Sequence, residues 1–285
     1  MSDVPVGIVV AANPRVPQVQ LAWTELEPAL RGTSGLEILA VDGGDLDYAS
    51  VNAEIVVVIG GDGAILRTCR NMGPMQLPIL GVNMGRLGFL ADMSPAEFLQ
   101  ALPQILARQY RILQCLMFEC ALTPANGPRQ VMLGLNEVVV SAASAMRIID
   151  VHLAIDGEAV TAYSCDGLIV STPVGSTAHS LSAGGPILRQ DLQAFVITPI
   201  CPHALTMRPL VDSADCQYTL TVPNIPEGVT LIVDGQLKLP LSSGDRIDIR
   251  RAGVQMRVVK VPGSSYYATL HRKLSWGGQP NYRLK

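Results

Sequence analysis

The sequence Gly60-Gly61-Asp62-Gly63 is the first candidate for chemistry, because it directly follows the apolar run Ile55–Ile59 and precedes a helical stretch. Glycines let a chain turn sharply and approach a ligand closely, and the free N–H groups of a helix start suit phosphate. An acidic residue repels phosphate, so Asp62 needs another reason to be there: it holds a metal ion or accepts a proton from an attacking hydroxyl. The plain alternative is a tight turn capped by Asp62. The Rossmann pattern is broken, because Leu66 stands where its third glycine belongs.

The segment Asp166–Pro186 is the most unusual in composition, because it combines several glycines with six Ser and Thr hydroxyls. Small hydroxyl donors and exposed backbone make a good surface for sugar and phosphate groups. A flexible connection is the alternative. The hydrophobic strand at its entry and its uneven composition favour a functional loop.

Asn136-Glu137 interrupts an apolar stretch, with Val131–Leu135 before it and Val138–Val140 after it. Adjacent residues of a strand face opposite ways, so one of the two polar side chains is expected to point inward. A buried carboxamide or carboxylate needs partners, and ribose hydroxyls are good ones. In the alternative reading, both side chains lie in a solvated loop.

The elements that position these residues change character along the chain. Over the first ~110 residues, strand-like runs alternate with helical stretches, which predicts an α/β domain with a parallel sheet covered by helices. A capping box at Ser94-Pro95-Ala96-Glu97 marks one helix start, and Pro28 is expected to end another helix early. The expected strands are 6–11, 36–41, 55–59 and 77–82, and the expected helices are 18–30, 64–72 and 95–108.

After Arg111, short alternating runs follow one another without a strong helical period, which predicts an all-β sandwich domain. The expected strands include 231–233, 247–249 and 254–259, and turn signals stand at Asn126-Gly127, Asp156-Gly157, Asp234-Gly235 and 243–245. The expected domains are therefore 1–110 and 111–264. Pattern alone does not place the polar and aromatic segment that follows.

Composition excludes several classes of protein. The chain has 285 residues, of which 48% are hydrophobic and only 16% are charged, and its net charge is −3. No Lys/Arg-rich run supports a nucleic-acid surface, and no apolar run approaches the ~18 residues of a membrane span. Without an evident leader peptide, a cytoplasmic protein with reduced thiols is expected. The cysteines, none in a C-x-x-C pair that would indicate zinc, are Cys69, Cys115, Cys120, Cys165, Cys201 and Cys216.

Taken together, the motifs resemble the NAD kinase family, whose members phosphorylate the 2′-hydroxyl of the adenosine ribose of NAD. They occur in family order and with family-like spacing over residues 55 to 276. The motifs that carry the resemblance are Gly60–Gly63, Asn83–Leu90, Asn136-Glu137, Asp166–Pro186, Pro202-His203, Arg208–Leu210 and Val233–Gln236. The resemblance implies an α/β domain and a β-sandwich domain, with residues 265–285 returning to the first domain.

The resemblance also implies roles for individual residues. Asp62 becomes the proton acceptor for the ribose hydroxyl, with Gly63 beside it touching the dinucleotide. Gly60, Gly61 and Asn83 belong to the phosphate-donor loop. The other residues implied to contact NAD are Asn136 and Glu137 at the adenosine part, Arg147 near the phosphates or the far end, Ser164 and Asp166 at the nicotinamide side, Thr177, Ala178, His179, Ser180, Leu181 and Ser182 along the binding groove, Cys201 through its backbone, and Gln236.

The implied partners are NAD, ATP as donor, and Mg²⁺ or another divalent cation held largely by the phosphates rather than by protein ligands alone. In the family, subunits associate, so a homodimer or homotetramer is implied. The donor range (ATP alone or polyphosphate also), the choice between NAD and NADH, the oligomer size and feedback by NADP stay open.

Three departures from the family pattern bear on donor choice, affinity and rate. Ala64 and Val174 each stand where threonine is usual, and His179 stands where tyrosine is usual. The two lost hydroxyls keep open a second reading, a dinucleotide-binding regulator that makes no product. A lipid or sphingoid kinase shares a related glycine turn but is disfavoured by Asp166–Pro186 and Val233–Gln236. A plain dehydrogenase is disfavoured by the broken Rossmann pattern.

Overall fold

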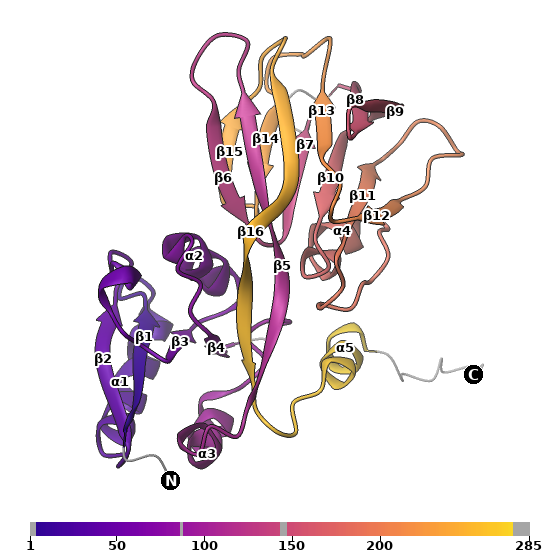
Figure 1. Ribbon diagram of the computed structural model, residues 1–285. Coiled ribbons are helices and arrows are strands. Elements are labelled where there is room, and N and C mark those ends of the chain that lie inside the picture. Colours follow the sequence, from indigo (N-terminus) through magenta and orange to yellow (C-terminus); the bar gives the residue numbers. More distant parts are fainter. Residues whose placement is uncertain (1–3, 86–87, 143–146, 276–285) are drawn as a thin grey trace, which may run out of the picture. The chain divides into compact units, whose positions relative to one another are not determined.

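The computed structural model of the chain describes residues 4–85, 88–142 and 147–275. It divides into two compact units, each described here by itself (Figure 1). Unit 1 comprises Met1–Leu113 and Arg257–Lys285, and unit 2 comprises Gln114–Met256. The pattern placed the boundaries at 110/111 and 264/265. The return to unit 1 begins earlier, because Val258 near the end of the last strand pairs with Ile79 of unit 1.

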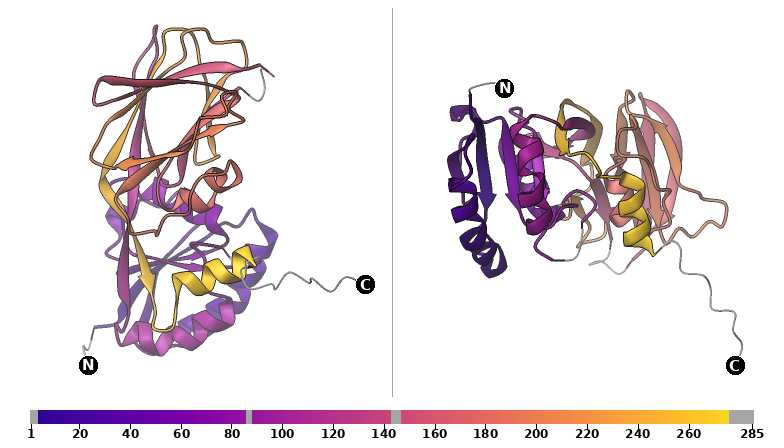
Figure 2. Two further views of the ribbon diagram at one scale, coloured as in Figure 1. Left: turned by 90° about the vertical axis from the view of Figure 1, so that its right-hand side faces the viewer. Right: turned by 90° about the horizontal axis from the view of Figure 1, so that it is seen from below.

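Unit 1 is built on a parallel sheet, as expected. Its strands follow the order β2-β1-β3-β4 and end with the last residues of β16 (Figures 1 and 2). Every residue of β3 is buried, the pattern of a strand covered on both faces. The bounds are β1 (Val6–Ala12), β2 (Leu36–Asp42), β3 (Ile55–Ile59), β4 (Ile79–Val82) and β16 (Arg246–Lys260).

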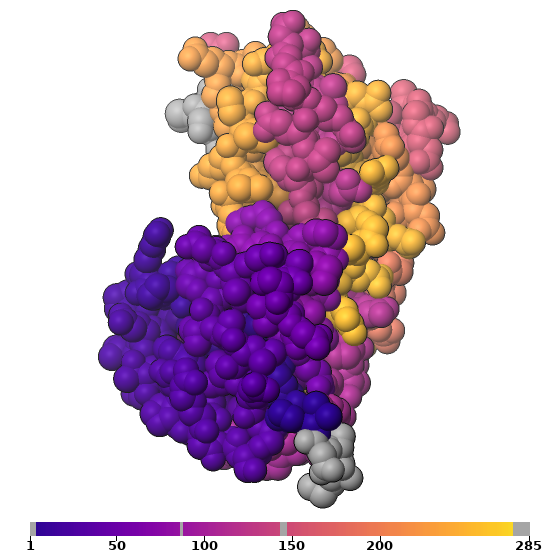
Figure 3. Space-filling model, turned by 60° about the vertical axis from the view of Figure 1, so that its left-hand side comes forward, coloured from indigo at the N-terminus to yellow at the C-terminus, as the bar shows by residue number. Residues whose placement is uncertain are grey.

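Helices cover both faces of this sheet, and Figure 3 shows the surface that the N-terminal part of the chain forms over it. Helices α1 and α3 cover one face, because Leu26 of α1 and Leu102 of α3 belong to the same apolar core as Val57 of β3. The second helix, α2, covers the opposite face, since Ile65 on it approaches Gly81 of β4. The bounds are α1 (Pro17–Arg31), η1 (Tyr48–Ser50), α2 (Asp62–Met72), α3 (Pro95–Leu106) and α5 (Tyr266–Leu274).

Three expectations for unit 1 need correction. Pro28 does not end α1 early: it lies in the last turn, where its missing N–H removes a single hydrogen bond, and its own carbonyl accepts from Gly32. The second helix begins at Asp62 rather than Ala64, so Asp62 lies inside its first turn. Helix α3 ends at Leu106, two residues short of the expected end, while the capping box at Ser94 is confirmed.

Unit 2 is all-β, as predicted, with two sheets that enclose one apolar core containing Phe118, Phe195 and Tyr218. The six-stranded sheet has the order β12-β11-β10-β7-β14-β15. In the other sheet β16 pairs with β13, β13 with β8 and β8 with β9, while β5 pairs with β6. The bounds are β5 (Arg111–Thr123), β6 (Gln130–Gly134), β7 (Glu137–Ser141), β8 (Ile149–Ile155), β9 (Glu158–Cys165), β10 (Gly167–Ser171), β11 (Ala194–Ile200), β12 (Leu210–Ser213), β13 (Tyr218–Thr221), β14 (Thr230–Val233) and β15 (Leu237–Pro240).

One expectation for unit 2 also changes. The runs 247–249 and 254–259 are parts of one long strand, β16, because Arg250 and Arg251 between them stay in the extended chain. The segment 166–186, where the sequence favours a functional loop over a flexible connection, contains β10, the 3-10 turn η2 (Gly175–Thr177) and the short helix α4 (His179–Ser182).

Candidate active site

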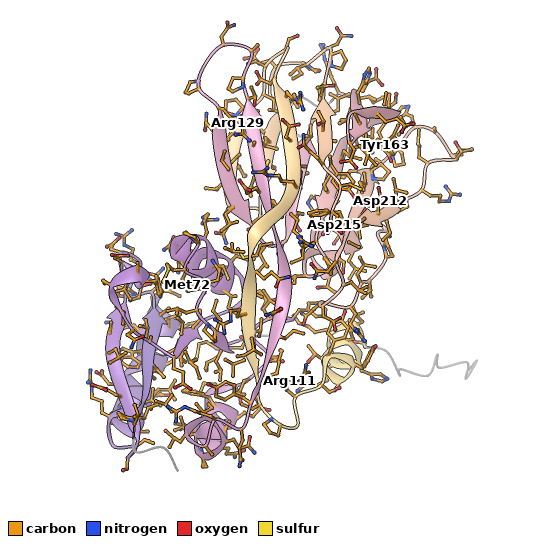
Figure 4. All side chains as sticks on the ribbon, in the orientation of Figure 1. Met72, Arg111, Arg129, Tyr163, Asp212 and Asp215 are labelled. Atoms are coloured by element: carbon orange, nitrogen blue, oxygen red, sulfur yellow. The ribbon has the colours of Figure 1, made fainter. Side chains whose placement is uncertain are left out.

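The carboxylate of Asp62 is held by a loop of the same unit, residues 88–91, which we name the Asp62 loop. Oδ2 accepts from the backbone N–H of Phe89 at 2.8 Å, and Oδ1 accepts from those of Leu90 at 3.1 Å and Ala91 at 3.0 Å. Asp62 therefore does not cap the helix; the N-cap is Gly61, and no side chain caps it. Three backbone donors fix the carboxylate at the start of α2, whose far end is labelled by Met72 in Figure 4.

The Asp62 loop is shaped by two further residues. Gly88 lies so close to the carboxylate that a Cβ there would stand 1.9 Å from Oδ1 of Asp62. Asn83 is buried; its Nδ2 donates to the carbonyl of Ala91 at 3.1 Å, and its Oδ1 accepts from the N–H of Gly85 at 2.8 Å. The predicted donor-loop residue Asn83 thus supports the loop that holds Asp62.

The returning C-terminal segment reaches the same loop. Helix α5 is capped by Ser265, and Nζ of Lys273 on that helix lies 5.1 Å from the centroid of the Phe89 ring. A cation over an aromatic face is attracted by the ring quadrupole. Since the N–H of Phe89 bonds Asp62, α5 contacts the loop that orients the acid.

A small recess lies at the carboxyl ends of β1 and β3, which are neighbours in the order β2-β1-β3-β4. The chain runs away from these strands in opposite directions, and such switch points are where parallel sheets bind ligands. The polar lining residues of the recess are Asn13, Asp42, Arg67, Thr68 and Asn71, and Ala64 lies among them. Sequence reasoning missed Arg67, although it stands one helical turn beyond Gly63 and shares its face of α2.

In unit 2, the turn formed by residues 135–137, which we name the Asn136 turn, is organised by Asp234. One carboxylate oxygen of Asp234 accepts from the N–H groups of Leu135, Asn136 and Glu137, at 3.1, 2.7 and 3.3 Å. The N–H of Asp234 donates in return to the carbonyl of Glu137 at 2.9 Å. The sequence pattern treated Asp234 only as a turn residue, so this role was missed.

The sequence predicted that one side chain of the pair Asn136-Glu137 points inward, and the structure shows that it is Glu137. Its side chain is buried, whereas Asn136 is half-buried. Among the described residues, Oε2 of Glu137 has no hydrogen-bond partner, and the carboxylate accepts from the backbone N–H of His179. Burial, followed by repulsion from the Asp234 carboxylate, raises the pKa of Glu137 to about 7. Such a carboxyl is suited to receive a ligand's hydroxyl or amine donor.

The glycine-rich segment packs directly on the Asn136 turn. The N–H of Thr172 donates to the carbonyl of Asn136 at 2.9 Å, and a Cβ at Gly175 would lie 2.1 Å from that carbonyl oxygen. Five of the six hydroxyls of the segment have hydrogen-bond partners within unit 2, and Ser180 pairs with Thr198 at 2.9 Å. The other four are those of Ser171, Thr172, Ser176 and Thr177, which donate to backbone carbonyls.

A second group of predicted residues gathers at the other end of β10. The carbonyl of Ser164 accepts from the N–H of His203, and the N–H of Asp166 donates to the carbonyl of Ile200, next to Cys201. The Ser164 hydroxyl bonds Asp150. Figure 4 labels Tyr163, one residue before Ser164 on β9. Cys201 is exposed and has a φ of 47°.

The two groups are separated by one strand length. Ser171 pairs with Glu137 and Gly167 pairs with Ser141, so β10 spans the distance from the Asn136 turn to Asp166. At about 3.3 Å per residue this is roughly 17 Å, enough to accept an extended molecule with two polar ends. Of the other predicted residues, Arg147, His179, Ser182 and Gln236 are exposed and Thr177, Ala178 and Leu181 are half-buried.

The described ranges contain neither a metal-binding cluster of side chains nor a helix suited to cross a membrane. Within them, no group of three or more His, Cys, Asp and Glu side chains converges in a way that could hold a metal ion. In the same ranges no helix combines the length and apolar character that crossing a bilayer requires. All six cysteines are unpaired, and four of them are buried, as expected.

Comparisons with known proteins match both units. Residues 46–110 match the ATP-NAD kinase N-terminal domain, and residues 135–261 match the ATP-NAD kinase C-terminal domain. The NAD kinase of Rhodopirellula baltica is 46% identical over 276 residues, which cover 96% of this chain and 88% of that protein. The NAD kinase of Geotalea daltonii is 42% identical over 79% of each chain.

Solved structures agree in fold. Yeast NADH kinase complexed with NADH superposes with a TM-score of 0.88 at 22% identity, covering 99% of this chain and 91% of that one. An NAD kinase from Archaeoglobus fulgidus in complex with ATP gives a TM-score of 0.71 at 27% identity, covering 94% and 98%. Both domain models are matched in order, and a relative that is 46% identical aligns along 96% of the chain, so the protein belongs to the ATP-NAD kinase family.

Proposed function

We propose that this protein transfers the terminal phosphoryl group of ATP to the 2′-hydroxyl of the adenosine ribose of NAD, giving NADP and ADP. The observation that carries the proposal is the Asp62 carboxylate, held by three backbone donors at the start of α2 in a chain that matches both NAD kinase domains. Relatives named NAD kinase at 46% and 42% identity support the same reaction.

Asp62 would act as the proton acceptor. The ribose 2′-oxygen attacks the γ-phosphorus, the bond from that phosphorus to the bridging oxygen of ADP breaks, and the hydroxyl proton passes to the Asp62 carboxylate. Phosphoryl transfer needs little covalent help from protein, so orientation of the nucleophile is the main contribution expected of a side chain. The Asp62 loop provides that orientation, because it fixes both carboxylate oxygens.

Unit 2 would hold the dinucleotide. Asn136 and the orphaned carboxyl of Glu137 offer hydrogen-bond partners to the adenosine part, while Ser164 and Asp166 at the far end of β10 are assigned to the nicotinamide side. The backbone of residues 177–182 would line the groove between them. Arg147, Cys201 and Gln236 complete the proposed contacts.

The terminal phosphates of the donor would lie against the recess at the carboxyl ends of β1 and β3, since the recess itself has room for about one water molecule. Arg67 lines the recess and can pair with phosphate there. The glycines Gly60, Gly61 and Gly63 stand just before it in the sequence and let the backbone approach a ligand closely. A divalent cation fits this site only if the nucleotide phosphates supply most of its ligands, since the described residues form no cluster of their own. Bound in that way, it would neutralise charge on the transferring group.

The proposed assembly and cellular location rest on the family resemblance. A homodimer or homotetramer is proposed. Among the described strands β9 pairs with β8 alone, which leaves a sheet edge where Val160 is 47% exposed. A cytoplasmic location is supported by six unpaired cysteines, which indicate a reducing compartment.

The test is an endpoint assay with purified protein, NAD, ATP and Mg²⁺, in which NADP is detected through an NADP-specific dehydrogenase. NADP should accumulate in proportion to the protein and should disappear when EDTA removes the cation. If NAD binds in a calorimeter but neither ATP nor polyphosphate gives NADP, the protein is a dinucleotide-binding regulator. Phosphorylation of diacylglycerol in liposomes, without NADP formation, would identify a lipid kinase.

A further inference from the structure

We propose that Asp234 is a positioning residue for NAD. It holds the Asn136 turn in its shape, and its charge influences whether the Glu137 carboxyl is protonated or ionised when the ligand binds. The proposal rests on the function proposed above and deepens it. Asp234 itself would not touch the dinucleotide; it acts through the two residues that would.

The geometry of the Asn136 turn is the first observation that supports a positioning role for Asp234. Asp234 is 5% exposed, and its Oδ1 lies within hydrogen-bond distance of three successive backbone N–H groups, with the shortest bond, 2.7 Å, to Asn136. Its Oδ2 also accepts from Leu135, at 3.0 Å. These groups lie 97 to 99 residues away in sequence. Because consecutive N–H groups seldom converge without an anion, the carboxylate defines the path of the Asn136 turn.

The turn that carries Asp234 does not itself require a carboxylate. The N–H of Gln236 donates to the carbonyl of Val233 at 3.0 Å, and Asp234 and Gly235 between them have φ values of 51° and 65°. Positive φ at both central residues is typical of a type I′ β-turn, in which Asn-Gly serves as well as Asp-Gly. The negative charge at position 234 is therefore explained by the Asn136 turn, not by the hairpin.

The charge also acts on Glu137. The field of Asp234 adds to burial in favouring the protonated carboxyl, and the N–H of His179 is the group that opposes it. Among the described residues, Asp234 is the titratable group that acts on Glu137, whereas His179, which is exposed on α4, acts through its backbone N–H. With a pKa of about 7, Glu137 is largely protonated at pH 6 and ionised at pH 8. A ligand that donates to the carboxylate should then bind about tenfold more weakly at pH 6 than at pH 8.

The variant Asp234→Asn tests what the charge of Asp234 contributes, because it keeps the hairpin and one acceptor oxygen for the Asn136 turn but removes the charge. Calorimetry of NAD binding at pH 6 and pH 8 is the readout, with kcat and the melting temperature measured in parallel. We expect the Kd at pH 8 to rise roughly tenfold, because charge-assisted hydrogen bonds are lost. The ratio of Kd at pH 6 to that at pH 8 should fall to about two, because Glu137 no longer faces a neighbouring anion.

The matched control is Asp245→Asn in the same unit. Asp245 is 7% exposed and also accepts two backbone N–H groups, from Ala125 at 3.0 Å and Ser242 at 2.8 Å. Its loss should lower the melting temperature while leaving the Kd for NAD and its pH ratio as in the unchanged protein. If Asp234→Asn behaves like this control, or if the control shifts the Kd equally, the proposal is overturned.

A second variant covers the case in which Asp234→Asn does not fold. Asp234→Glu keeps the charge but moves it by one methylene, so the Kd should rise while the pH ratio stays near tenfold; an unchanged Kd would refute the positioning role. The measurement is independent of catalysis. Binding of NAD without NADP formation would defeat the proposed reaction alone, whereas absence of NAD binding to the unchanged protein would defeat both.

Discussion

Gly88 and Asp62 are in such close contact that no other residue fits at position 88. A Cβ there would lie 1.9 Å from Oδ1 of Asp62 and 2.7 Å from its Cγ, while the two positions are 26 residues apart in sequence. The missing side chain allows the backbone of the Asp62 loop to approach the carboxylate and donate three hydrogen bonds to it.

Substitution Gly88→Ala should therefore displace the Asp62 carboxylate. We expect kcat to fall at least roughly tenfold and the free energy of unfolding to fall by about 1–3 kcal/mol, as in other overpacked sites. The matched control is Gly85→Ala in the same segment, where a Cβ would meet nothing within 4 Å. Equal kcat values for the two variants would show that the close contact does not matter for turnover.

Substitution Asp62→Asn should separate binding from turnover. An amide can still accept one backbone N–H but cannot take up the hydroxyl proton, so kcat should fall at least ~100-fold while the Kd for NAD stays within about threefold. Asp47→Asn is the control, because Asp47 is an exposed aspartate of unit 1 whose carboxylate accepts from the N–H of Ala49. Undiminished turnover by Asp62→Asn would remove Asp62 from the proton-acceptor role.

Local patterns predicted most of the elements. The strand Ile55–Ile59 was predicted with its exact bounds, and the capping box at Ser94 marked the helix start, because both depend on residues adjacent in sequence. Strand alternation predicted that one of Asn136 and Glu137 points inward, and the structure shows that it is Glu137. Pro28 was misjudged because the cost of a proline depends on how many helical bonds follow it, which sequence alone does not show.

The supports of the candidate site were not predictable from local sequence. Asp62 receives its hydrogen bonds from residues 27 to 29 positions away, and Asp234 from residues 97 to 99 positions away. No periodicity links such partners, and Asp234-Gly235 already had a sufficient explanation as a turn. The residues named from family resemblance, including Arg147 and Gln236, remain predictions until a dinucleotide is bound.

Substitution Gly175→Ala should disturb the Asn136 turn from the opposite side. A Cβ at this position would lie 2.1 Å from the carbonyl oxygen of Asn136 and 2.6 Å from the hydroxyl of Ser171. We expect the Kd for NAD to rise roughly tenfold, because the backbone of either turn must move. Gly253→Ala is the control in the same unit, with nothing within 4 Å of its Cβ. If both variants bind NAD alike, the packing of the two turns is not what shapes the site.

Substitution Glu137→Gln should change how stability depends on pH. The pKa of Glu137 is raised from 4.5 to about 7 in the folded protein, so the folded state binds the proton more tightly than the unfolded chain does. The ionised carboxylate is therefore unfavourable in the fold, and stability is lost as the pH rises from about 4.5 to about 7 and then levels off.

The amide cannot ionise, so this loss should vanish in the variant. The free energy of unfolding of Glu137→Gln should exceed that of the unchanged protein by more at pH 8 than at pH 5. This gain should grow by up to about 3 kcal/mol between the two pH values. Denaturant titrations at the two pH values measure the gain, with Glu158→Gln, an exposed glutamate at the start of β9, as the control. A gain that is the same at pH 5 and pH 8 would mean that Glu137 does not titrate in this window. Glu137 would then be ionised throughout, and the orphaned oxygen would require a partner that the fold itself does not provide.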